Sequence, residues 1–251
     1  MFFKKSIEQN KIMAIDMHCH IIPGVDDGAA DIEESMKMFH IAKEQGIMSI
    51  IATPHYHVNR GHASVKKIQN QADLLQEAIS NENPDFHIYL GNEINHNSEA
   101  FEKLRDKQIN TMAGSDYILV EFSPGDSFKM IYQALYMYQS EGYFPILAHI
   151  ERYRSLYGHM DYIEQLHELG IYFQINAGTI AGNNGKESQK FADEIMKRDM
   201  LNFVATDAHN ALNRKPQIDK AVIRIRKLFG ENRVNKYLYE NPLNIIKNEV
   251  I

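Results

Sequence analysis

Residues 15–28 read IDMHCHIIPGVDDG, and this stretch decides how the rest of the chain is interpreted. The apolar run 12–17 at its start is typical of a short strand buried on both faces, as strands of parallel sheets are. His18 and His20 follow that run, and an Asp-Asp pair begins six residues after His20. In an extended segment, residues two apart point the same way, so His18 and His20 can bind one metal ion together.

Short apolar runs and longer amphipathic segments alternate along the rest of the chain. The further runs expected to be strands are 48–52, 86–90, 117–122, 144–148, 171–175 and 203–205. The segments with helical spacing of apolar residues are 31–45, 63–79, 128–141, 160–169, 186–198 and 216–229. This alternation, without a Ser- or Pro-rich linker, predicts one α/β domain whose parallel sheet curls into a barrel. The domain is expected to span residues 12–251, with 1–11 as an N-terminal extension and 232–251 as one or two closing helices.

The segment 31–45 shows how its helix is expected to begin and end. Asp31 followed by Glu34 predicts a capping box, in which each side chain binds a free backbone N–H of the first turn. Gly46 stands where a C-terminal cap belongs.

Residues of metal-ligand type stand where the predicted strands end. They are His18 and His20 after the first strand, His55 after the second, Glu93 after the third, Glu121 at the end of the fourth, His149 after the fifth, and Asp207 and His209 after the seventh. Barrel enzymes build their sites at the carboxyl ends of parallel strands, so these side chains should converge. Asp207 and His209, two apart like His18 and His20, are expected to form a second chelating pair.

The mixture of imidazole and carboxylate indicates which ions would bind. It suits Mn²⁺, Fe²⁺, Zn²⁺ and Ni²⁺, with Co²⁺ also possible, whereas an oxygen-only Mg²⁺ or Ca²⁺ site would not need five histidines. So many charged groups would repel one another or stay protonated without cations. Two or three ions, with a carboxylate such as Glu93 bridging them, would remove this conflict.

Each of these residues also has a simpler interpretation when it is taken alone. His149 could be a hydrogen-bonded core histidine, Glu121 a buried carboxylate paired to an arginine, and Asp207 a helix cap. Their occurrence together at successive strand ends favours metal binding. A cysteine phosphatase is not supported, because the residue six after Cys19 is Val25 rather than the arginine that closes the phosphate cradle.

Composition argues against several classes of function. The net charge of -6 argues against a nucleic-acid surface, which needs a basic patch. No apolar run approaches the roughly 18 residues of a membrane-spanning helix, and the start of the chain is too polar for a signal peptide. With Cys19 as the only cysteine, no intrachain disulfide can form, and the cytoplasm is the expected compartment.

At these motifs the chain resembles the PHP (polymerase and histidinol phosphatase) superfamily. More narrowly, it looks like the manganese-dependent bacterial tyrosine-protein phosphatases linked to capsule and exopolysaccharide synthesis. The stretches that carry the resemblance are 15–28, 52–55 (ATPH), 91–94 (GNEI), 119–122 (LVEF), 148–153 (AHIERY) and 206–210 (TDAHN). They occur in order from about residue 12 to the C-terminus.

The resemblance implies a distorted TIM-like (β/α)7 barrel with three metal ions, Mn²⁺ foremost. The implied ligands are His18, His20, Asp27, His55, Glu93, Glu121, His149, Asp207 and His209, with Asp27 a better match than Asp26. Arg152 and Arg214 match arginines that contact the phosphate. The loop 56–61 departs from the family pattern, which leaves the exact substrate open.

The expected reaction is hydrolysis of a phosphate monoester by a metal-activated hydroxide, with Asp207 or a ligand histidine as the proton donor. The favoured substrate is phosphotyrosine on a bacterial tyrosine kinase that controls capsule synthesis. The alternatives are a small-molecule phosphatase, such as one acting on histidinol phosphate, and a non-catalytic metal-binding module that docks on a kinase. The sequence does not determine the oligomeric state.

Overall fold

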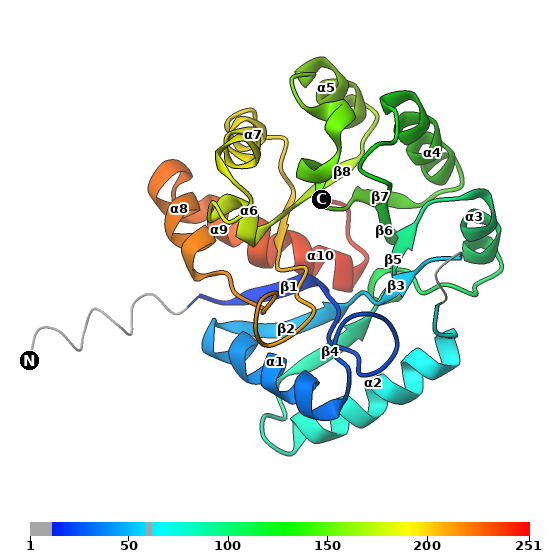
Figure 1. Ribbon diagram of the computed structural model, residues 1–251, viewed down its shortest axis with the longest axis vertical. Helices are drawn as coiled ribbons and strands as arrows, with labels where there is room; N and C mark the ends of the chain where they lie inside the picture. The colour runs from blue at the N-terminus through cyan, green and yellow to red at the C-terminus, as the bar shows by residue number, and fades with distance from the viewer. Residues whose placement is uncertain (1–11, 59–61) are drawn as a thin grey trace, which may run out of the picture.

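The computed structural model describes residues 12–58 and 62–251, in which helices surround a curled parallel sheet (Figure 1). The strands are β1 (Ala14–Cys19), β2 (Ile47–Ala52), β3 (His55–Tyr56), β4 (His87–Leu90), β5 (Glu93–Asn95), β6 (Tyr117–Glu121), β7 (Phe144–Leu147), β8 (Tyr172–Asn176) and β9 (Phe203–Ala205). The α-helices are α1 (Ile32–Glu44), α2 (Val65–Ser80), α3 (Ser98–Arg105), α4 (Phe128–Ser140), α5 (Met160–Glu168), α6 (Ala177–Ile180), α7 (Lys186–Lys197), α8 (Asp219–Phe229), α9 (Glu231–Asn235) and α10 (Asn241–Lys247). Shorter helical turns are η2 (Met112–Gly114), η3 (Ile150–Arg152), η4 (Arg154–Leu156) and the π-helical η5 (Lys236–Glu240).

The nine strands correspond to seven strands of a barrel. All pairings are parallel, in the orders β1-β2-β4 and β3-β5-β6-β7-β8-β9. β3 follows β2 after two residues and β5 follows β4 after two residues, so β2/β3 and β4/β5 are each one interrupted strand. A backbone bridge between Cys19 and Ala208 brings the end of β1 against the segment after β9. The α/β fold with a distorted (β/α)7 barrel is therefore confirmed.

The seven expected strands agree with the structure to within two residues, and the largest offset occurs in β1. β3 and β5 were not expected, so His55 and Glu93 each begin a strand rather than following one. Strand β1 was expected over 12–17 but spans Ala14–Cys19, because its ladder begins where Ala14 N–H donates to Gly46 O at 3.1 Å. His18 therefore lies inside the strand rather than after it, and that expectation was wrong. A register irregularity between Asp16 and Cys19 bends the strand there, as a β-bulge does.

An apolar layer fills the barrel below the site. Tyr117 and Leu119 of β6 belong to a buried cluster inside the barrel, and Glu121, two residues further along the same face, reaches the polar end. On β8, Tyr172 packs against this cluster and Gln174 follows it on the same face. Because every second residue of a strand faces the barrel interior, the polar side chains at the strand ends lie directly above the packed core.

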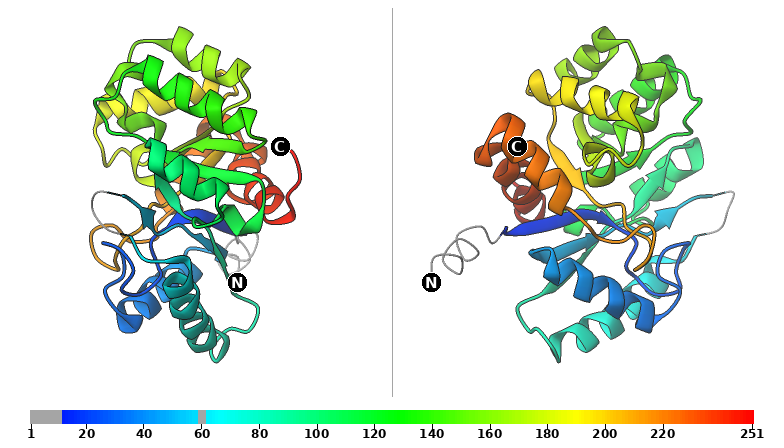
Figure 2. Two further views of the ribbon diagram at one scale, coloured as in Figure 1. Left: turned by 90° about the vertical axis from the view of Figure 1, so that its right-hand side faces the viewer. Right: turned by 60° about the vertical axis from the view of Figure 1, so that its left-hand side comes forward.

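The C-terminal segment closes the opposite end of the barrel. Ile245 of α10 is buried in the inner apolar cluster, and the Tyr117 hydroxyl at the start of β6 donates to Glu249 O at 2.9 Å. The right-hand view of Figure 2 shows the C-terminal helices near the end from which β1 starts. The site at the other end of the strands is left accessible.

Helix α1 begins as expected, but its capping box is only half formed. The Asp31 side chain accepts from Glu34 N at 2.9 Å, as predicted. The Glu34 carboxylate instead accepts from Ala211 N at 2.7 Å, in the loop after β9. Two helices, α3 and α6, had not been expected from the sequence. Both are short, with eight and four residues, and so carry little periodic signal.

The described residues contain no helix that combines the length and the apolar character needed to cross a bilayer. The expected N-terminal extension, 1–11, lies outside the described residues, as do residues 59–61 of the loop that departs from the family pattern.

Candidate metal centre

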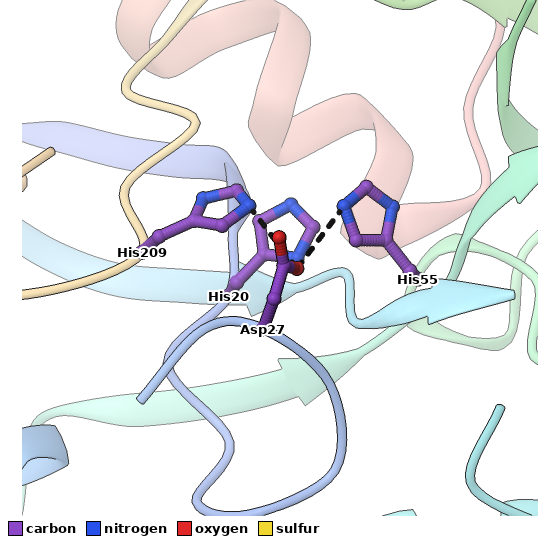
Figure 3. A group of neighbouring side chains, drawn as sticks. All are labelled: His20, Asp27, His55 and His209. Atoms are coloured by element: carbon purple, nitrogen blue, oxygen red, sulfur yellow. Dashed lines mark ion pairs between the residues drawn. The ribbon is translucent and has the colours of Figure 1, made fainter. Parts of the chain in front are cut away.

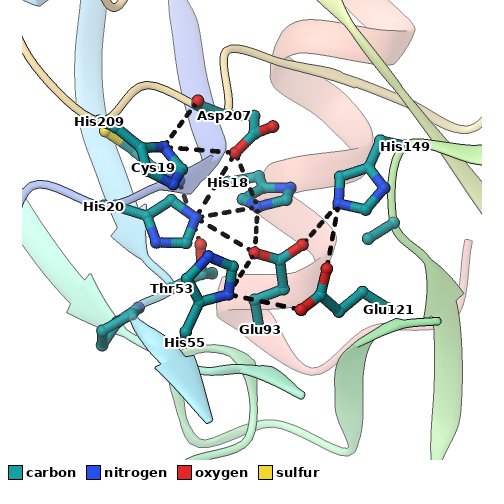
Figure 4. Close-up of polar contacts among 12 residues, drawn as sticks. His18, Cys19, His20, Thr53, His55, Glu93, Glu121, His149, Asp207 and His209 are labelled. Atoms are coloured by element: carbon teal, nitrogen blue, oxygen red, sulfur yellow. Dashed lines mark hydrogen bonds and ion pairs between the residues drawn. The ribbon is translucent and has the colours of Figure 1, made fainter. Parts of the chain in front are cut away.

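The side chains that the sequence singled out as metal ligands meet at the carboxyl ends of the strands (Figure 4). Eight of the nine, all except His149, supply ligand atoms to three groups in which all atoms lie within 4.8 Å of one another. The groups are His20, Asp27, His55 and His209; His18, His20, Glu93 and Asp207; and His55, Glu93 and Glu121. Three overlapping groups correspond in number to the three ions that the resemblance implies.

The first group, drawn in Figure 3, contains the one exposed residue of the three groups, Asp27. Asp27 Oδ1 lies 3.5 Å from His55 Nε2 and 3.6 Å from His209 Nε2. The Asp27 side chain is 69% exposed, whereas His20 and His209 are buried. An exposed carboxylate aimed at buried imidazoles is placed to coordinate an ion at the mouth of the site.

The second group lies deeper in the barrel. Glu93 Oε2 is 3.2 Å from the Nε2 atoms of both His18 and His20, and Asp207 Oδ1 is 3.5 Å from each of them. The two histidine Nε2 atoms are themselves 3.3 Å apart. The two Nε2 atoms are thus close enough to bind one ion together, and chelation by His18 and His20 stays a prediction.

The third group extends toward β6 and β7. Glu93 Oε2 lies 3.1 Å and Glu121 Oε1 lies 3.6 Å from His55 Nδ1. His149 Nε2 faces the same two carboxylates, at 2.6 Å from Glu93 and 3.7 Å from Glu121. Glu93 contributes to two of the three groups, as expected of a bridging ligand.

Buried polar atoms without a hydrogen bond show that the site fits cations. Among the described residues, these atoms include His55 Nδ1, Glu93 Oε2, His149 Nδ1 and His209 Nε2. His55 Nδ1 and Glu93 Oε2 lie within ion-pair distance but lack the alignment of a hydrogen bond. Because burying such atoms unpaired is costly, the convergence of His55 Nδ1, Glu93 Oε2 and His209 Nε2 is best explained by divalent cations that they would share.

The carboxylates raise the pKa of several histidines against the effect of burial. Burial disfavours the His18 imidazolium, but Glu93 and Asp207 outweigh it, and the pKa of His18 is raised. The pKa of His20 is raised well above its usual value despite the same burial. Burial and the charge of His20 lower the pKa of His209 to about 3, so this imidazole is neutral and ready to coordinate.

The pKa values of three carboxyl groups of the site shift in different directions, depending on their neighbours. Burial opposes the ionisation of Glu93 and Asp207, but nearby histidines hold the pKa of each well below its usual value. Burial and the charge of Glu93 raise the pKa of Glu121 to about 7. A cation in the third group would remove that repulsion and favour the ionised form of Glu121.

Two ligand residues have left-handed backbones, His149 with φ 31° and Asp207 with φ 52°. The Asp207 pair was expected to chelate from an extended segment, and for Asp207 that expectation was wrong. The chain turns immediately after β9, and the turn brings Asp207 Oδ1 to 3.6 Å from His209 Nδ1. Such conformations are strained for non-glycine residues and persist where the surrounding structure holds them.

A buried amide pair, Gln174 and Asn176 of β8, supports these ligands and was missed in the sequence. Gln174 Oε1 accepts from His149 N at 2.7 Å and lies 3.2 Å from His18 Nδ1. Gln174 Nε2 donates to Asn176 Oδ1 at 2.8 Å, and Asn176 Nδ2 donates to Asp207 Oδ2 at 2.9 Å. Because an amide oxygen can only accept, Gln174 selects the His18 tautomer whose Nε2 is free for a metal.

Asp26 plays a similar part for His20. Its Oδ2 lies 2.7 Å from His20 Nδ1 and accepts from His55 N at 2.9 Å, so the carboxylate orients one ligand ring and the backbone of another. The neighbouring Asp27 contributes instead to the first ligand group. The geometry thus separates the two aspartates in the way that the family pattern suggested.

Two arginines hold the outer side of Asp207. Arg152 Nη2 pairs with Asp207 Oδ2, and Arg214 Nη2 donates to Asp207 Oδ1 at 2.9 Å. Their side chains are 39% and 42% exposed, so other guanidinium N–H groups remain available to a substrate. Both arginines therefore stand where a phosphate over the ligand cluster could be bound.

Cys19 does not take part in this chemistry. Its side chain is fully buried, and burial raises the pKa of the thiol well above its usual value. The thiol lies 3.8 Å from Ala208 O at the junction that closes the barrel. The Cys19 side chain is therefore part of the packed core.

Fold and site together define a parallel barrel with a candidate multinuclear metal centre at the carboxyl ends of its strands. The family model for capsular polysaccharide synthesis proteins, CpsB/CapC, matches residues 14–247. The chain belongs to this CpsB/CapC family.

Curated relatives agree with this assignment. The chain is 33% identical to the tyrosine-protein phosphatase YwqE of Bacillus subtilis, over 94% of this chain and 93% of the relative. It is 32% identical to the tyrosine-protein phosphatase CpsB of Streptococcus pneumoniae, over 94% of this chain and all of the relative. A solved structure described as one of the "unique metal-dependent tyrosine phosphatases" YwqE and CpsB superposes with a TM-score of 0.87, at 33% identity over 94% of this chain and 96% of that one.

More distant structures share the fold alone. The phosphotriesterase homology protein of Escherichia coli has a TM-score of 0.63 at 12% identity, covering 94% of this chain and 99% of that one.

Proposed function

We propose that this protein is a metal-dependent tyrosine-protein phosphatase that removes phosphate from phosphotyrosine in a protein substrate. The observation that carries the proposal is the set of three overlapping ligand groups beside two arginines held by Asp207. The relatives named tyrosine-protein phosphatases, which match along almost the whole chain, support it.

We propose Mn²⁺ as the ion, with Fe²⁺, Zn²⁺, Ni²⁺ and Co²⁺ as possible substitutes, because the donors are imidazoles and carboxylates. The residues that would hold two or three ions are His18, His20, Asp27, His55, Glu93, Glu121, His149, Asp207 and His209. When bound, divalent cations lower the pKa of water and neutralise phosphoryl oxygens, which makes hydrolysis possible near neutral pH.

The contribution of the arginines is binding and orientation. A guanidinium has a planar fork of N–H donors that fits phosphate oxygens, and Asp207 fixes the side of each fork that faces the protein. Arg152 and Arg214 would thereby hold the phosphate in one orientation and stabilise charge on its oxygens.

Asp207 is better suited to anchoring than to donating a proton. His18 and His20 outweigh its burial and hold the pKa of this carboxyl well below its usual value. Its oxygens also accept from Asn176 and both arginines. The phenolate of tyrosine, with a pKa near 10, needs less help in leaving than an aliphatic alkoxide does.

The proposed substrate is a bacterial tyrosine kinase that acts in capsule or exopolysaccharide synthesis. The membership of the chain in a capsular polysaccharide synthesis family supports this role. We further propose that residues 12–251 form one catalytic domain and that the protein acts in the cytoplasm.

The test is a comparison of three substrates with purified protein and Mn²⁺. A phosphotyrosine peptide should show a higher kcat/KM than the same peptide with phosphoserine and than histidinol phosphate. His149→Ala, prepared identically, controls for contaminating phosphatases. Preference for histidinol phosphate would replace the proposal with a small-molecule phosphatase, and no hydrolysis of any substrate would favour a non-catalytic metal-binding module.

A further inference from the structure

A polar cavity of about 210 Å³ opens beside the metal centre on the side of Asp207. Its walls come from η3, from α6 and the loop that follows it, from the loop after β9, and from the start of α8. Figure 1 shows α6 and α8 as neighbours at this part of the barrel. The side chains used below are Arg152, Asn183, Asn213, Arg214, Lys215 and Lys220, and we call this cavity the basic pocket.

The basic pocket gathers positive charge in a chain whose net charge is -6. Four of its lining residues are cations, Arg152, Arg214, Lys215 and Lys220, and two are acids, Asp207 and Asp219. Asp207 is already paired with both arginines. Within residues 12–58 and 62–251, neither lysine forms an ion pair, so their charges are not compensated by the described part of the chain.

Amide side chains also line the basic pocket. Within the described part of the chain, the side chains of Asn183 and Asn213 form no hydrogen bond, although both line the pocket. Asn184, beside them, donates to Thr179 Oγ1 at 2.7 Å and is thereby fixed. With Asp207 held by the arginines, Asp219 is the one other acid in the lining, and its Oδ1 accepts from Lys220 N at 2.8 Å. The two ammonium groups and the amide N–H groups therefore outnumber the acids, and together they suit a carboxylate ligand.

We propose that the basic pocket binds the carboxylate of a glutamate or aspartate that flanks the phosphotyrosine in the substrate protein. This inference rests on the proposed function, because it needs a phosphotyrosine over the metal centre. Lys215 directly follows Arg214 in the chain, and both line the same cavity. An acidic residue near the phosphotyrosine would therefore contact Lys215 and Lys220 while the phosphate contacts the two arginines.

The test compares phosphotyrosine peptides that differ at one flanking position, which carries Glu, Ala, Lys or phosphoserine. With Mn²⁺ and the unmodified chain, Glu should raise kcat/KM over Ala by about five- to tenfold, since each of the two partly exposed lysines contributes about threefold. Added salt should reduce this preference, because screening weakens exposed charge pairs. In Lys215→Ala/Lys220→Ala the preference should fall to near one, while hydrolysis of para-nitrophenyl phosphate stays unchanged.

A matched control separates local binding from the general field of the protein. Lys190→Ala/Lys227→Ala removes the same charge from two exposed lysines outside the pocket, and it should retain the preference. In Lys215→Glu/Lys220→Glu the preference should reverse in favour of Lys.

Three outcomes would overturn the inference: equal rates for the Glu and Ala peptides, loss of preference in the control variant, or a stronger gain from phosphoserine than from Glu. The last would assign the pocket to a second phosphate. Hydrolysis of no phosphotyrosine peptide at all would contradict the proposed function instead.

Discussion

Glu93 approaches four histidines with two oxygens, and this one carboxylate connects the ligand groups. Its Oε2 lies 3.1–3.2 Å from His18, His20 and His55, and its Oε1 lies 2.6 Å from His149. A glutamine at this position would keep the shape of the side chain but lose the negative charge that two neighbouring cations require.

We therefore expect Glu93→Gln to bind fewer Mn²⁺ ions per chain and to lose more than about a hundredfold in kcat, because even partners of metal ligands contribute about 10- to 100-fold. Metal content by atomic spectroscopy and turnover of a phosphotyrosine peptide would measure both effects. Glu102→Gln, on the exposed surface of α3, is the control and should match the unmodified chain. Full metal content in Glu93→Gln would exclude a bridging role.

Gln174 shows what a sequence does not reveal about such a site. The histidines and acids could be predicted because their residue types bind metals and they recur at strand ends. Gln174, Asn176 and Asp26 act only through those ligands, by hydrogen bonds that depend on the closed barrel. An amide in a strand carries no motif, so this support becomes visible only when the distances are known.

Replacing Gln174 by methionine, which has a similar length but no carbonyl oxygen, should weaken Mn²⁺ binding by about 10- to 100-fold. The His18 ring and the left-handed His149 would both lose an acceptor. Isothermal titration calorimetry measures the affinity directly, and circular dichroism verifies the fold. Gln133→Met, exposed on α4, serves as the control. Unchanged Mn²⁺ affinity in Gln174→Met would show that Gln174 is not needed to orient His18 and His149.

At the scale of elements, the sequence predicted the seven barrel strands and the long helices, and it failed where tertiary contacts decide. The start of β1 depends on its pairing with Gly46, and the conformation of Asp207 depends on a turn after β9. Glu34 left its expected cap to bind the loop after β9, a partner 177 residues away. Local patterns cannot contain such distant partners.

The Asn210 side chain accepts three hydrogen bonds from the backbone of the loop between β9 and α8. Asn210 Oδ1 accepts from Leu212 N at 3.0 Å, Asn213 N at 2.8 Å and Arg214 N at 3.1 Å. This loop carries Arg214, whose guanidinium reaches Asp207. Asn210 therefore positions an arginine expected to contact the phosphate, without being a metal ligand itself.

We expect Asn210→Ala to raise KM for phosphotyrosine peptides by about five- to tenfold, which corresponds to about 1 kcal/mol, the net contribution of one hydrogen bond, because water can replace part of the lost bonding in this exposed loop. Affinity for Mn²⁺ should change little, which separates substrate positioning from metal binding. Asn210→Asp keeps an acceptor oxygen for the three N–H groups and should restore KM. Equal KM values in the alanine variant and the unmodified chain would contradict this account.

At the scale of the whole molecule, bound metal would join distant parts of the barrel. The candidate ligands come from β1 at one end of the sequence and from the segment after β9 at the other, a junction otherwise made by the bridge between Cys19 and Ala208. Ions that bind only the folded chain stabilise it by about 2.7 kcal/mol at a concentration one hundred times Kd. Chelation should therefore lower the melting temperature.

The decrease in melting temperature on chelation should depend on pH. The pKa shifts of the ligand histidines determine whether it grows or shrinks as pH rises. Glu93 and Asp207 raise the pKa of His18 against its burial. In the metal-free chain such an imidazolium stabilises the fold below its unfolded pKa of about 6.5, and this stabilisation is lost as pH rises through the folded pKa. The pKa of His20 and of His55 is also raised, whereas burial lowers the pKa of His149 and of His209, whose neutral forms are favoured. Protons therefore compete with cations at His18, His20 and His55, and metal binds more weakly at low pH.

The difference in melting temperature between Mn²⁺-loaded and chelated protein should thus be larger at about pH 8.5 than at about pH 6. Differential scanning calorimetry at both pH values measures it, with Ca²⁺ as a control ion that imidazole ligands do not favour. Titration of Mn²⁺ in buffers of different ionisation enthalpy should also show proton release on binding. A difference that is equal at both pH values, or larger at the lower one, would mean that the clustered histidines do not hold the metal.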